Sequence, residues 1–544
     1  MAGSGEQWDL DADVVVAGSG GAGLTAAILA HDHGARVVVV ERSDKVGGTT
    51  AVSGGGLWIP MNDHMAEVGA SDTREEALAY CKAITAGQAP DELVETFVDT
   101  AAVMVRYLEE HTPVSFSATK MPDYRAEEQG AKLGGRTLDP EMLLKSELGE
   151  WEDKLRPSPL MFVPLKIEES LRGMAQPKSI PVAIVVDRMK KGIVASGNAL
   201  IGRLLKGCLE RDITILLGAR VRELVEEDGR VVGLRAEREG QPFSISAKGG
   251  VVLACGGFEW NDELRDQHLP VSVAGHCSPP YNEGDGLAMA QAVGAEVDNM
   301  AEAWIYPGGV IPGEEHEGKP VSRWIMAERT LPHVILVNKA GQRFANEAQS
   351  YHDLGKAFAD PANLPCWAIM DSQYRSKYPV LTMLPGDPDP DWLTKAESLA
   401  ELATATGIDA GGLTATVARW NEMVGQGRDA DFGRGEGGYE RWLGDPEAEH
   451  PNLGTLSEPP FYALPIYAHS AGTKGGPKTN TKGEVLAKGG QPIAGLYAAG
   501  NVMANIAGPG YYGGGGTIGT AMTWGYLCGK NAAGAASAAA AANE

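Results

Sequence analysis

The order of elements at the N-terminal end constrains the fold of this chain more than any other feature. Residues 12–17 (ADVVVA) form a short, apolar, β-branched run, which predicts a buried parallel strand. The glycine-rich sequence GSGGAG follows at 18–23, and the Ala- and Leu-rich residues 24–33 predict a helix that ends at Gly34. Residues 35–41 (ARVVVVE) then return as a second strand. The chain therefore begins with a complete βαβ unit of the kind that binds dinucleotides.

The glycines of this unit have separate physical roles. Gly18 permits the tight turn, Gly20 lets the backbone approach a pyrophosphate, and Gly23 allows the helix to pack closely on the strand. Glu41, 18 residues after Gly23, is expected to hold a ribose 2′-hydroxyl, and its charge would repel a 2′-phosphate. An incidental glycine turn would show the same GxGxxG spacing, but not the strand, helix and acid around it. The unit therefore predicts FAD or NAD in preference to NADP.

The composition argues against several classes of protein. The 544 residues carry 47 basic and 72 acidic side chains, a formal net charge of −25. Nucleic-acid binding requires clustered Lys and Arg, so we expect no nucleic-acid partner. We find no secretory signal, no apolar run of the roughly 20 residues that span a bilayer, and no metal-ligand spacing among the cysteines. We therefore expect a reduced, cytoplasmic chain without a metal site. The six cysteines are Cys81, Cys208, Cys255, Cys277, Cys366 and Cys528.

A second glycine-rich segment favours FAD over NAD. Residues 42–60 (RSDKVGGTTAVSGGGLWIP) stand where a simple NAD domain has its third strand, and such a backbone is able to run along a large cofactor. The pattern GGTTxxSGGxxWxP within it resembles the flavin-contacting stretch of the FAD-dependent fumarate reductase and 3-ketosteroid dehydrogenase superfamily, in its steroid branch. The segment lacks the histidine that carries covalent flavin in some relatives, which implies noncovalent FAD. The resemblance implies FAD contacts at Gly48, Thr49, Ser53, Gly54 and Gly55.

The same resemblance places further FAD contacts along the chain. Residues 250–257 (GVVLACGG) predict a second buried parallel strand that ends in glycines. The Ala-rich residues 520–542 predict a terminal helix, whose positive N-terminal end would stabilise the anion formed at the flavin's pyrimidine edge on hydride uptake. A glycine-rich loop that merely caps a terminal helix would have the same composition. The additional contacts that the resemblance implies are Val221, Gly256, Asp285, Gly500, Asn501, Thr517 and Ile518.

The order of the expected elements indicates the fold class. We expect an α/β protein, with a Rossmann-like FAD-binding domain and an inserted α+β catalytic domain. Apolar periodicity predicts two helices within 73–111 and one over 198–212, and Asp228-Gly229 predicts a hairpin turn. From about residue 296 the pattern changes to short strands, turns and helices. The expected domains are residues 1–295 (first part of the FAD-binding domain), 296–458 (catalytic domain) and 459–544 (returning part of the FAD-binding domain).

Tyrosines dominate the candidate catalytic residues. The fumarate reductases of the superfamily use Arg and His in the C-terminal stretch that reads GPGYYGGGGTIG here, so dicarboxylate substrates are disfavoured. Phenols suit a ketone, because loss of hydride from one carbon is easier when the carbon next to the carbonyl loses a proton and the enolate oxygen accepts hydrogen bonds. The pattern YxGxGxTIGxAMTxGY from Tyr511 onward resembles that of the 3-ketosteroid 1-dehydrogenases, and the resemblance extends over most of the chain.

By this resemblance Tyr351 is the catalytic base, Tyr124 assists it, and Tyr511 together with the N–H of Gly515 polarises the ketone. Hydride would pass from carbon 1 of a 3-ketosteroid to the flavin, with loss of the proton at carbon 2. A free phenol ionises near pH 10, so the pKa of Tyr351 would have to be lowered, by Tyr124 or by a helix N-terminus. Tyr512 stands where relatives commonly have proline, so either Tyr511 or Tyr512 would bind the carbonyl. Each tyrosine is also compatible with a half-buried structural role.

Two further departures from the family affect the site. His352 follows Tyr351 in a Ser-Tyr-His-Asp sequence where Pro-Tyr-Asp is commoner, and on a turn it would perturb the pKa of Tyr351. Residues 139–190 are longer than in the family and are expected to form a lid over the steroid entrance. An apolar lid would also provide a peripheral contact with a membrane.

Competing functions remain open from the sequence. They are a 3-keto-5α-steroid 4-dehydrogenase, an alkene reductase of the fumarate reductase type, and a protein without catalysis that transfers electrons through FAD or binds steroids. No second strand-GxGxxG-helix unit is visible, so NAD(P)H is not an expected partner. The expected partners are a 3-ketosteroid and a quinone or another electron acceptor.

Overall fold

The computed structural model describes residues 8–543 and contains the expected N-terminal βαβ unit. β1 (Leu10–Ala17), α1 (Gly21–Asp32) and β2 (Val37–Val40) follow one another, and β1 pairs with β2 in parallel, with Val14 opposite Val37. All four valines of β2 are buried, as expected for a strand that is covered on both faces. The GSGGAG turn therefore lies at the carboxyl end of β1, the edge at which such sheets bind dinucleotides.

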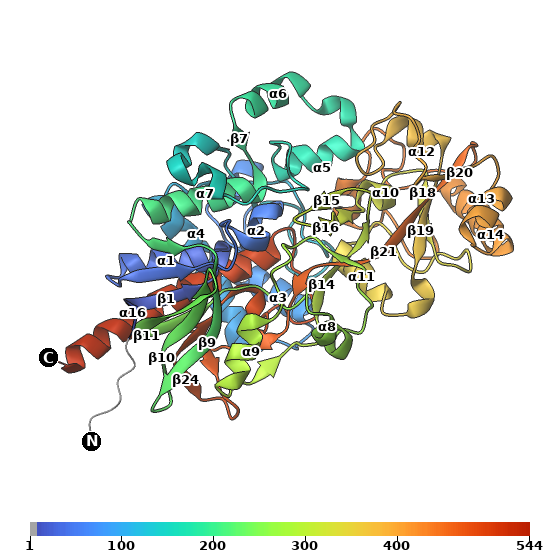
Figure 1. Ribbon diagram of the computed structural model, residues 1–544. Helices are drawn as coiled ribbons and strands as arrows, with labels where there is room; N and C mark the ends of the chain where they lie inside the picture. Colours follow the sequence, from blue (N-terminus) through green and yellow to red (C-terminus); the bar gives the residue numbers. More distant parts are fainter. Residues whose placement is uncertain (1–7, 544) are drawn as a thin grey trace.

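An eight-stranded sheet extends from this unit (Figure 1). Its strand order is β23-β24-β10-β11-β1-β2-β8, with β9 paired to β10. β11 runs parallel to β1 as expected, and its parallel pairing ends at Leu253, just before the glycines. Asp228 and Gly229 both have positive φ between β9 and β10, which confirms the hairpin turn. The strands are β8 (Thr214–Leu216), β9 (Ala219–Glu227), β10 (Arg230–Arg238), β11 (Gln241–Leu253), β23 (Glu484–Leu486) and β24 (Pro492–Ala498).

The C-terminal helix α16 (Gly516–Asn543) packs directly against α1. A Cβ atom at Gly525 or Gly529 would lie 2.3 Å from the carbonyl oxygen of Ala22 or Ala26, respectively, so the two helix backbones are in close contact. Figure 1 shows this red helix beside the blue N-terminal unit. The N-terminus of α16 is thereby brought to the same edge of the sheet as the GSGGAG turn, and both line one cavity.

A second sheet forms the other lobe of the molecule, drawn mainly in yellow and orange in Figure 1. Its strand order is β17-β14-β21-β19-β18, with β12 and β20 also paired to β21. Apolar residues such as Leu336, Met370 and Ile466 form its core. The strands are β12 (Gly275–His276), β14 (Ala303–Gly309), β17 (Arg323–Trp324), β18 (Val334–Val337), β19 (Cys366–Asp371), β20 (Thr394–Ala396) and β21 (Phe461–Thr473).

The second sheet crosses both expected limits of the catalytic domain. Its central strand β21 follows residue 458, and its edge strand β12 precedes residue 296. β21 pairs with β12 from the first expected segment and with β14 from the second, so strand pairing joins all three segments. The chain returns to the first sheet only afterwards, at β23. The division into 1–295, 296–458 and 459–544 stays a prediction.

The helices expected from periodicity are present. Thr73 and Glu76 form a capping box at the start of α3, and Pro90 is the N-cap of α4, which explains why the apolar pattern breaks there. No helix in the described part of the chain is both long and apolar enough to cross a membrane. The principal remaining helices are α2 (Gly48–Val52), α3 (Arg74–Thr85), α4 (Asp91–His111), α7 (Ser196–Leu209), α8 (Asp262–His268), α9 (Asp285–Ala292), α10 (Ala327–Thr330), α11 (Tyr351–Ala357), α12 (Ser372–Lys377), α13 (Leu399–Thr406), α14 (Ala410–Gly425) and α15 (Gly438–Leu443).

A segment made of short helices lies between the two lobes, at the top of Figure 1. It comprises the 3₁₀ segment η2 (Lys145–Lys154), α5 (Ile167–Ala175), the turn η3 (Pro177–Ser179) and α6 (Val182–Lys190). Val185 is the one buried residue of α6. These helices coincide with the segment expected to form a lid.

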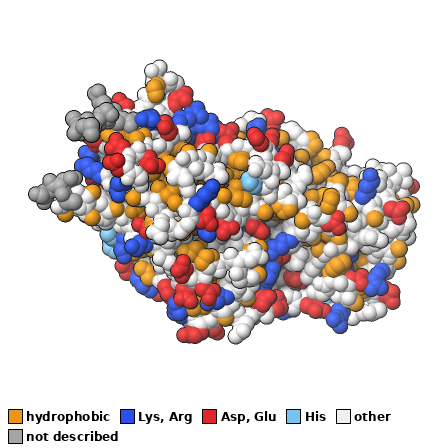
Figure 2. Space-filling view, turned by 90° about the horizontal axis from the view of Figure 1, so that it is seen from below, with side chains coloured by type: hydrophobic (Ala, Val, Ile, Leu, Met, Phe, Trp, Pro, Cys, Tyr) orange, Lys and Arg blue, Asp and Glu red, His pale blue; other side chains and the backbone are white. Residues whose placement is uncertain are grey.

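Acidic and basic side chains are interspersed over the face of the molecule drawn in Figure 2. A groove for nucleic acid would instead gather Lys and Arg side chains into a stripe that neutralises phosphates. Within residues 8–543 no group of three or more His, Cys, Asp or Glu side chains is arranged to hold a metal ion.

Candidate active site

One cavity of about 340 Å³ runs from the GSGGAG turn to the lid and the second lobe. It has the size of an ordinary small-molecule site. Gly23 and Tyr512, the alternative to Tyr511, do not line it, whereas the other residues expected at the site do. The lining residues that the sequence indicated are Gly18, Gly20, Glu41, Gly48, Thr49, Ser53, Gly54, Gly55, Tyr124, Val221, Gly256, Asp285, Tyr351, Gly500, Asn501, Tyr511, Gly515, Thr517 and Ile518.

The glycine turn forms one wall of the cavity. Gly18 has φ +111°, and a Cβ atom there would lie 2.3 Å from the carbonyl oxygen of Ala254, so only glycine fits. Gly20 is the N-cap of α1 without a side-chain cap, and a Cβ atom there would meet nothing nearer than 3.9 Å. At Gly23 a Cβ atom would lie 2.1 Å from the Gly18 carbonyl oxygen, which accords with a packing role outside the cavity. The helix N-terminus thus faces an open space that suits a pyrophosphate.

Glu41 lies directly after β2 and is held by its neighbours. Its carboxylate accepts hydrogen bonds from the N–H and hydroxyl of Ser19, at 3.0 and 2.6 Å, and from the N–H of Ser43 at 2.9 Å. A carboxylate has about four acceptor positions, so this arrangement orients Glu41 and leaves it able to accept from a ribose hydroxyl.

Asp285 is engaged mainly by arginine. Arg220 donates to both of its oxygens, at 2.9 and 2.6 Å, and Arg42 lies 3.4 Å from one of them. Glu283 also pairs with Arg220 and Arg42. Asp285 therefore fixes two arginines at the edge of the cavity near Val221.

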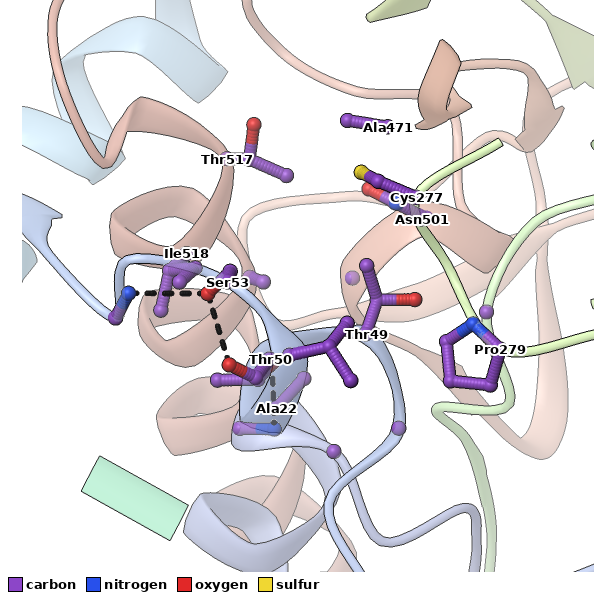
Figure 3. Close-up of a pocket in the computed structure, with 18 of the residues that line it drawn as sticks. Ala22, Thr49, Thr50, Ser53, Cys277, Pro279, Ala471, Asn501, Thr517 and Ile518 are labelled. Carbon is purple, nitrogen blue, oxygen red and sulfur yellow. Dashed lines mark hydrogen bonds between the residues drawn. The ribbon is translucent and has the colours of Figure 1, made fainter. Parts of the chain in front are cut away.

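The short helix α2 connects this wall to the centre of the cavity, as Figure 3 shows. Thr50 Oγ1 accepts from the N–H of Gly21 at 3.2 Å, and Ser53 Oγ donates to the Thr50 carbonyl and accepts from the N–H of Gly55. Asn282 donates to Thr49 Oγ1 at 3.1 Å. Thr50 and Asn282 were not among the expected contacts, although Thr50 belongs to the GGTTxxSGG pattern that the sequence singled out.

The N-terminal turn of α16 lies opposite α2. Gly515 has φ +91°, and a Cβ atom there would lie 2.2 Å from the carbonyl oxygen of Gly56. None of the described residues accepts a main-chain hydrogen bond from the Gly515 N–H. Thr517 and Ile518 follow in the first turn and line the cavity, and Figure 3 shows Ile518 near Ser53. The positive end of a long helix therefore meets the cavity, as expected.

Three of the expected tyrosines come together at the other end of the cavity. The ring centroids of Tyr124 and Tyr351 are 5.5 Å apart, those of Tyr124 and Tyr511 5.2 Å, and those of Tyr351 and Tyr511 5.6 Å. All three pairs meet edge to face. Thr517 Oγ1 donates to the hydroxyl oxygen of Tyr511 at 3.0 Å, so the phenolic proton of Tyr511 is free for another acceptor. We refer to Tyr124, Tyr351 and Tyr511 as the tyrosine cluster.

Tyr512 does not line the cavity. Its ring is fully buried and stacks on Trp58 at 5.0 Å and on Phe97 at 5.8 Å. Only Tyr511 of the two tyrosines reaches the cavity.

Comparison with known proteins adds independent evidence. A family model described as an FAD binding domain matches residues 13–518. A 4-oxocyclohexanecarboxylate 2-dehydrogenase of Sinomonas cyclohexanicum is 39% identical, over 96% of this chain and 93% of that protein. A 3-oxosteroid 1-dehydrogenase of Mycolicibacterium smegmatis is 36% identical, over 97% and 98%. The crystal structure of 3-ketosteroid delta1-dehydrogenase from Sterolibacterium denitrificans in complex with 1,4-androstadiene-3,17-dione matches with a TM-score of 0.91 at 34% identity, covering 96% of this chain and 99% of that chain.

This chain belongs to the FAD-dependent 3-ketosteroid dehydrogenase superfamily. The flavoprotein is an FAD-dependent oxidoreductase, and its α/β fold with an FAD-binding domain is confirmed. The cavity fits that cofactor, because the uncapped N-terminus of α1, the glycine wall and the acceptor Glu41 lie in one continuous space.

The pKa of the candidate base differs from the expectation. Burial raises the pKa of Tyr351 well above that of a free phenol, and the neighbouring Tyr124 and Tyr511 raise it further. Burial likewise raises the pKa of Tyr124. Tyr351 begins α11, but its pKa is not lowered there: desolvation of a phenolate in this apolar surrounding has the largest effect, and Tyr124 adds to it instead of opposing it.

His352 contacts the loop that carries Tyr511. Its Nε2 hydrogen-bonds the carbonyl of Pro509 at 3.1 Å, and Lys474 Nζ donates to the carbonyl of Gly510 at 2.7 Å. Burial lowers the pKa of His352 to about 3 and that of Lys474 to about 7. These two side chains therefore hold the loop that carries Tyr511.

A fourth tyrosine in the flavoprotein's cavity was missed in the sequence. Tyr439 packs edge to face on Tyr124 with ring centroids 4.8 Å apart, and its buried hydroxyl has no hydrogen-bond partner among the described residues. Trp324 also lies against Tyr351, at 4.6 Å. Tyr439 stands in α15, far from the other tyrosines along the chain, so only tertiary structure brings it to them.

The lid supplies apolar side chains to the same cavity. Residues of the 139–190 segment that line it include Leu160, Met161, Ile167, Leu171 and Met174. The segment expected to form the lid therefore lines the cavity, and its action as a lid stays a prediction.

Proposed function

We propose that this flavoprotein catalyses the 1,2-dehydrogenation of 3-ketosteroids. The observation that carries the proposal is the tyrosine cluster: three buried phenols converge on one point of the cavity wall, beside the N-terminus of α16 and beneath an apolar lid. The 36% identical relative and the structural neighbour are named for this reaction, which also supports the proposal.

The lining of the cavity favours a steroid over a small keto acid, although the 39% identical relative is named for a cyclohexanone carboxylate. A bound carboxylate needs a cation or several donors. The arginines of the lining are already paired: Arg42 with Glu283, Arg220 with Asp285, and Arg156 with Glu317. All three lie toward the nucleotide end. The lid end is lined by Leu, Ile and Met side chains, which suit the apolar rings of a steroid.

Each residue of the tyrosine cluster has a distinct task in the proposed mechanism. The hydroxyl of Tyr511 and the N–H of Gly515 donate to the substrate carbonyl and stabilise the enolate oxygen as it forms. Tyr351 removes the proton from carbon 2, and Tyr124 shares a hydrogen bond with it. Bound FAD supplies the acceptor for the hydride that leaves carbon 1. The apolar lid excludes water while these charges develop.

The decisive experiment measures the loss of absorbance of the oxidised flavin under anaerobic conditions. Saturated 3-ketosteroids should bleach the purified holoenzyme, whereas 4-oxocyclohexanecarboxylate and dicarboxylates should bleach it at least about tenfold more slowly, because a carboxylate would lose its solvation against the lid. With an artificial electron acceptor, the product should be the 1,2-unsaturated ketone.

Other outcomes separate the alternatives. If the product is the 4-ene alone, the reaction is 4,5-dehydrogenation and not 1,2-dehydrogenation. If only 4-oxocyclohexanecarboxylate bleaches the flavin, the substrate is that keto acid and not a steroid. Reduction of an activated alkene without ketone oxidation would indicate a reductase. If no ketone bleaches the flavin, the protein would instead transfer electrons through FAD or bind steroids without catalysis.

The remaining partner expectations belong to the same proposal. FAD is held noncovalently, so acid precipitation should release it into the supernatant. Electrons leave to a quinone or a similar acceptor, so a soluble quinone should restore the colour of the bleached enzyme, and NAD⁺ should not.

The exposed side of the lid suits an anionic lipid surface. Phe162, Val182, Ile184, Val186 and Met189 are all exposed there. The exposed basic side chains Lys178 and Lys190 flank them in a chain whose net charge is −25, and Lys191 is paired with Asp187 at 2.7 Å. Apolar side chains with neighbouring cations are typical of peripheral membrane contacts, and an apolar substrate partitions into the same phase.

We expect the protein to cosediment with vesicles of phosphatidylserine and phosphatidylcholine. The double substitution Val182→Glu and Met189→Glu should reduce the bound fraction at least about fivefold, since two apolar anchors become charged. Val103→Glu, at an exposed valine of α4, is the matched control and should bind as the wild type does. Failure of the wild-type protein to bind vesicles would remove the membrane contact without affecting the proposed reaction.

A further inference from the structure

A buried arginine lies behind the tyrosine cluster without a bound carboxylate. Arg329, in α10, is 0% exposed. Its Nε donates to the carbonyl of Ile325 at 3.0 Å, and its Nη1 donates to the carbonyls of Glu347 and Gln349, both at 2.6 Å. Its Nη2 lies 3.4 Å from the sulfur of Met326. Its hydrogen bonds thus go to three main-chain carbonyls and one thioether.

This arrangement differs from that of the other buried arginines in the same lobe. Arg343 binds the carboxylates of both Glu347 and Asp429, and Arg434 lies 3.5 Å from Glu347. A buried cation is costly unless an opposite charge or full hydrogen bonding compensates it. Arg329 has only carbonyls and a thioether as hydrogen-bond partners and pairs with no carboxylate in the described part of the chain, so its positive charge is available to nearby groups that become negative.

The strongest electrostatic partners of Arg329 are the phenols of Tyr439, Tyr124 and Tyr351 and the carboxyl of Glu328. Glu328 is buried and accepts from the N–H groups of Met326 and Leu381, and burial raises its pKa, which favours its neutral form. The phenols are therefore the principal groups on which Arg329 can stabilise a negative charge.

Arg329 also orders the segment that carries Tyr351. The carbonyls of Glu347 and Gln349 belong to the turn immediately before Ser350, which caps α11. Because Tyr351 is the first residue of α11, the same guanidinium that carries the charge also fixes the backbone two residues before the candidate base.

We infer that Arg329 is a positioning residue for the dehydrogenation, which holds the Tyr351 turn and stabilises the phenolate that the tyrosine cluster forms by losing one proton to water. This inference rests on the proposed function, since it explains how a buried phenol becomes a base. The phenolate then accepts the proton from carbon 2, so the proton balance closes over one turnover. Arg329 lowers the pKa of Tyr124 and of Tyr439, opposing the effect of burial, which agrees with this role.

The test is the pH profile of anaerobic flavin reduction by a 3-ketosteroid. In Arg329→Gln, the rate constant at pH 7 should fall about tenfold or more and should recover as the pH rises. Loss of the cation raises the pKa of the phenol, and each unit means tenfold less phenolate at neutral pH. Arg329→Lys keeps the charge with fewer donors and should retain the wild-type pH midpoint. Arg375→Gln removes another buried arginine, which binds Asp389 outside the cavity, and should leave the midpoint unchanged.

A second readout does not depend on substrate. The ultraviolet absorbance of tyrosinate in the holoenzyme should titrate at a higher pH in Arg329→Gln than in the wild type, and the difference should disappear when Tyr124, Tyr351 and Tyr439 are all replaced by Phe. An equal rate loss at every pH, or an unchanged tyrosinate titration, would overturn the inference. A wild-type enzyme that no ketosteroid reduces would refute the proposed function, whereas the tyrosinate titration would still decide the role of Arg329.

Discussion

Replacing Tyr351 by phenylalanine is expected to slow flavin reduction by a 3-ketosteroid by about 10²–10⁴-fold, the usual contribution of a positioned general base. The phenyl ring keeps the edge-to-face contacts with Tyr124 and Tyr511, so the cavity should retain its shape. FAD binding should not change, because Tyr351 lies at the tyrosine end of the cavity. Stopped-flow reduction under anaerobic conditions measures the rate constant, and the absorbance spectrum reports the bound flavin.

Tyr512, which follows Tyr511 in the chain, offers a matched control for this prediction. Tyr512→Phe removes a hydroxyl whose contact with the Ile506 carbonyl, at 3.4 Å, is long, and its ring lies outside the cavity. Its rate of flavin reduction should stay within about threefold of the wild type. Equal effects of Tyr351→Phe and Tyr512→Phe would show that loss of rate reflects general damage to the site, and an unimpaired Tyr351→Phe would exclude this residue as the base.

Replacing Gly20 by valine is expected to weaken FAD binding by about 100-fold or more. The Cβ atom has room inside the protein, since its nearest neighbour would be 3.9 Å away, and the backbone of Gly20 has φ −72°, which any residue adopts. The added side chain instead enters the cavity where the backbone must approach the pyrophosphate. Titration of the apoprotein with FAD measures the affinity, and thermal unfolding of the apoprotein should change little.

Gly23 provides the contrasting case within the same motif. A Cβ atom at Gly23 would lie 2.1 Å from the Gly18 carbonyl oxygen, so Gly23→Ala should lower the unfolding temperature of the apoprotein itself. The two variants therefore distinguish a glycine needed by the cofactor from one needed by the fold. Unchanged FAD affinity in Gly20→Val would contradict the placement of the pyrophosphate at the N-terminus of α1.

The sequence alone located the parts of the site that depend on short-range spacing. The βαβ unit, the separate roles of Gly18, Gly20 and Gly23, and the acid at Glu41 all lie within 30 residues, and strand, turn and helix preferences specify them locally. Thr49 and Ser53 were implied by the resemblance of a short motif to a known family. Such patterns can be read from a sequence because the contacts that they encode are close along the chain.

The structure alone decided what depends on distant segments meeting. It places Tyr511, and not Tyr512, in the cavity, brings Tyr439 and Arg329 to Tyr124, and returns β21 to the second sheet after residue 458. The pKa of Tyr351 also depends on how deeply the folded protein buries it, which local sequence does not encode. Local preferences determine which elements form, whereas packing over hundreds of residues determines which side chains share a cavity and what charge they can carry there.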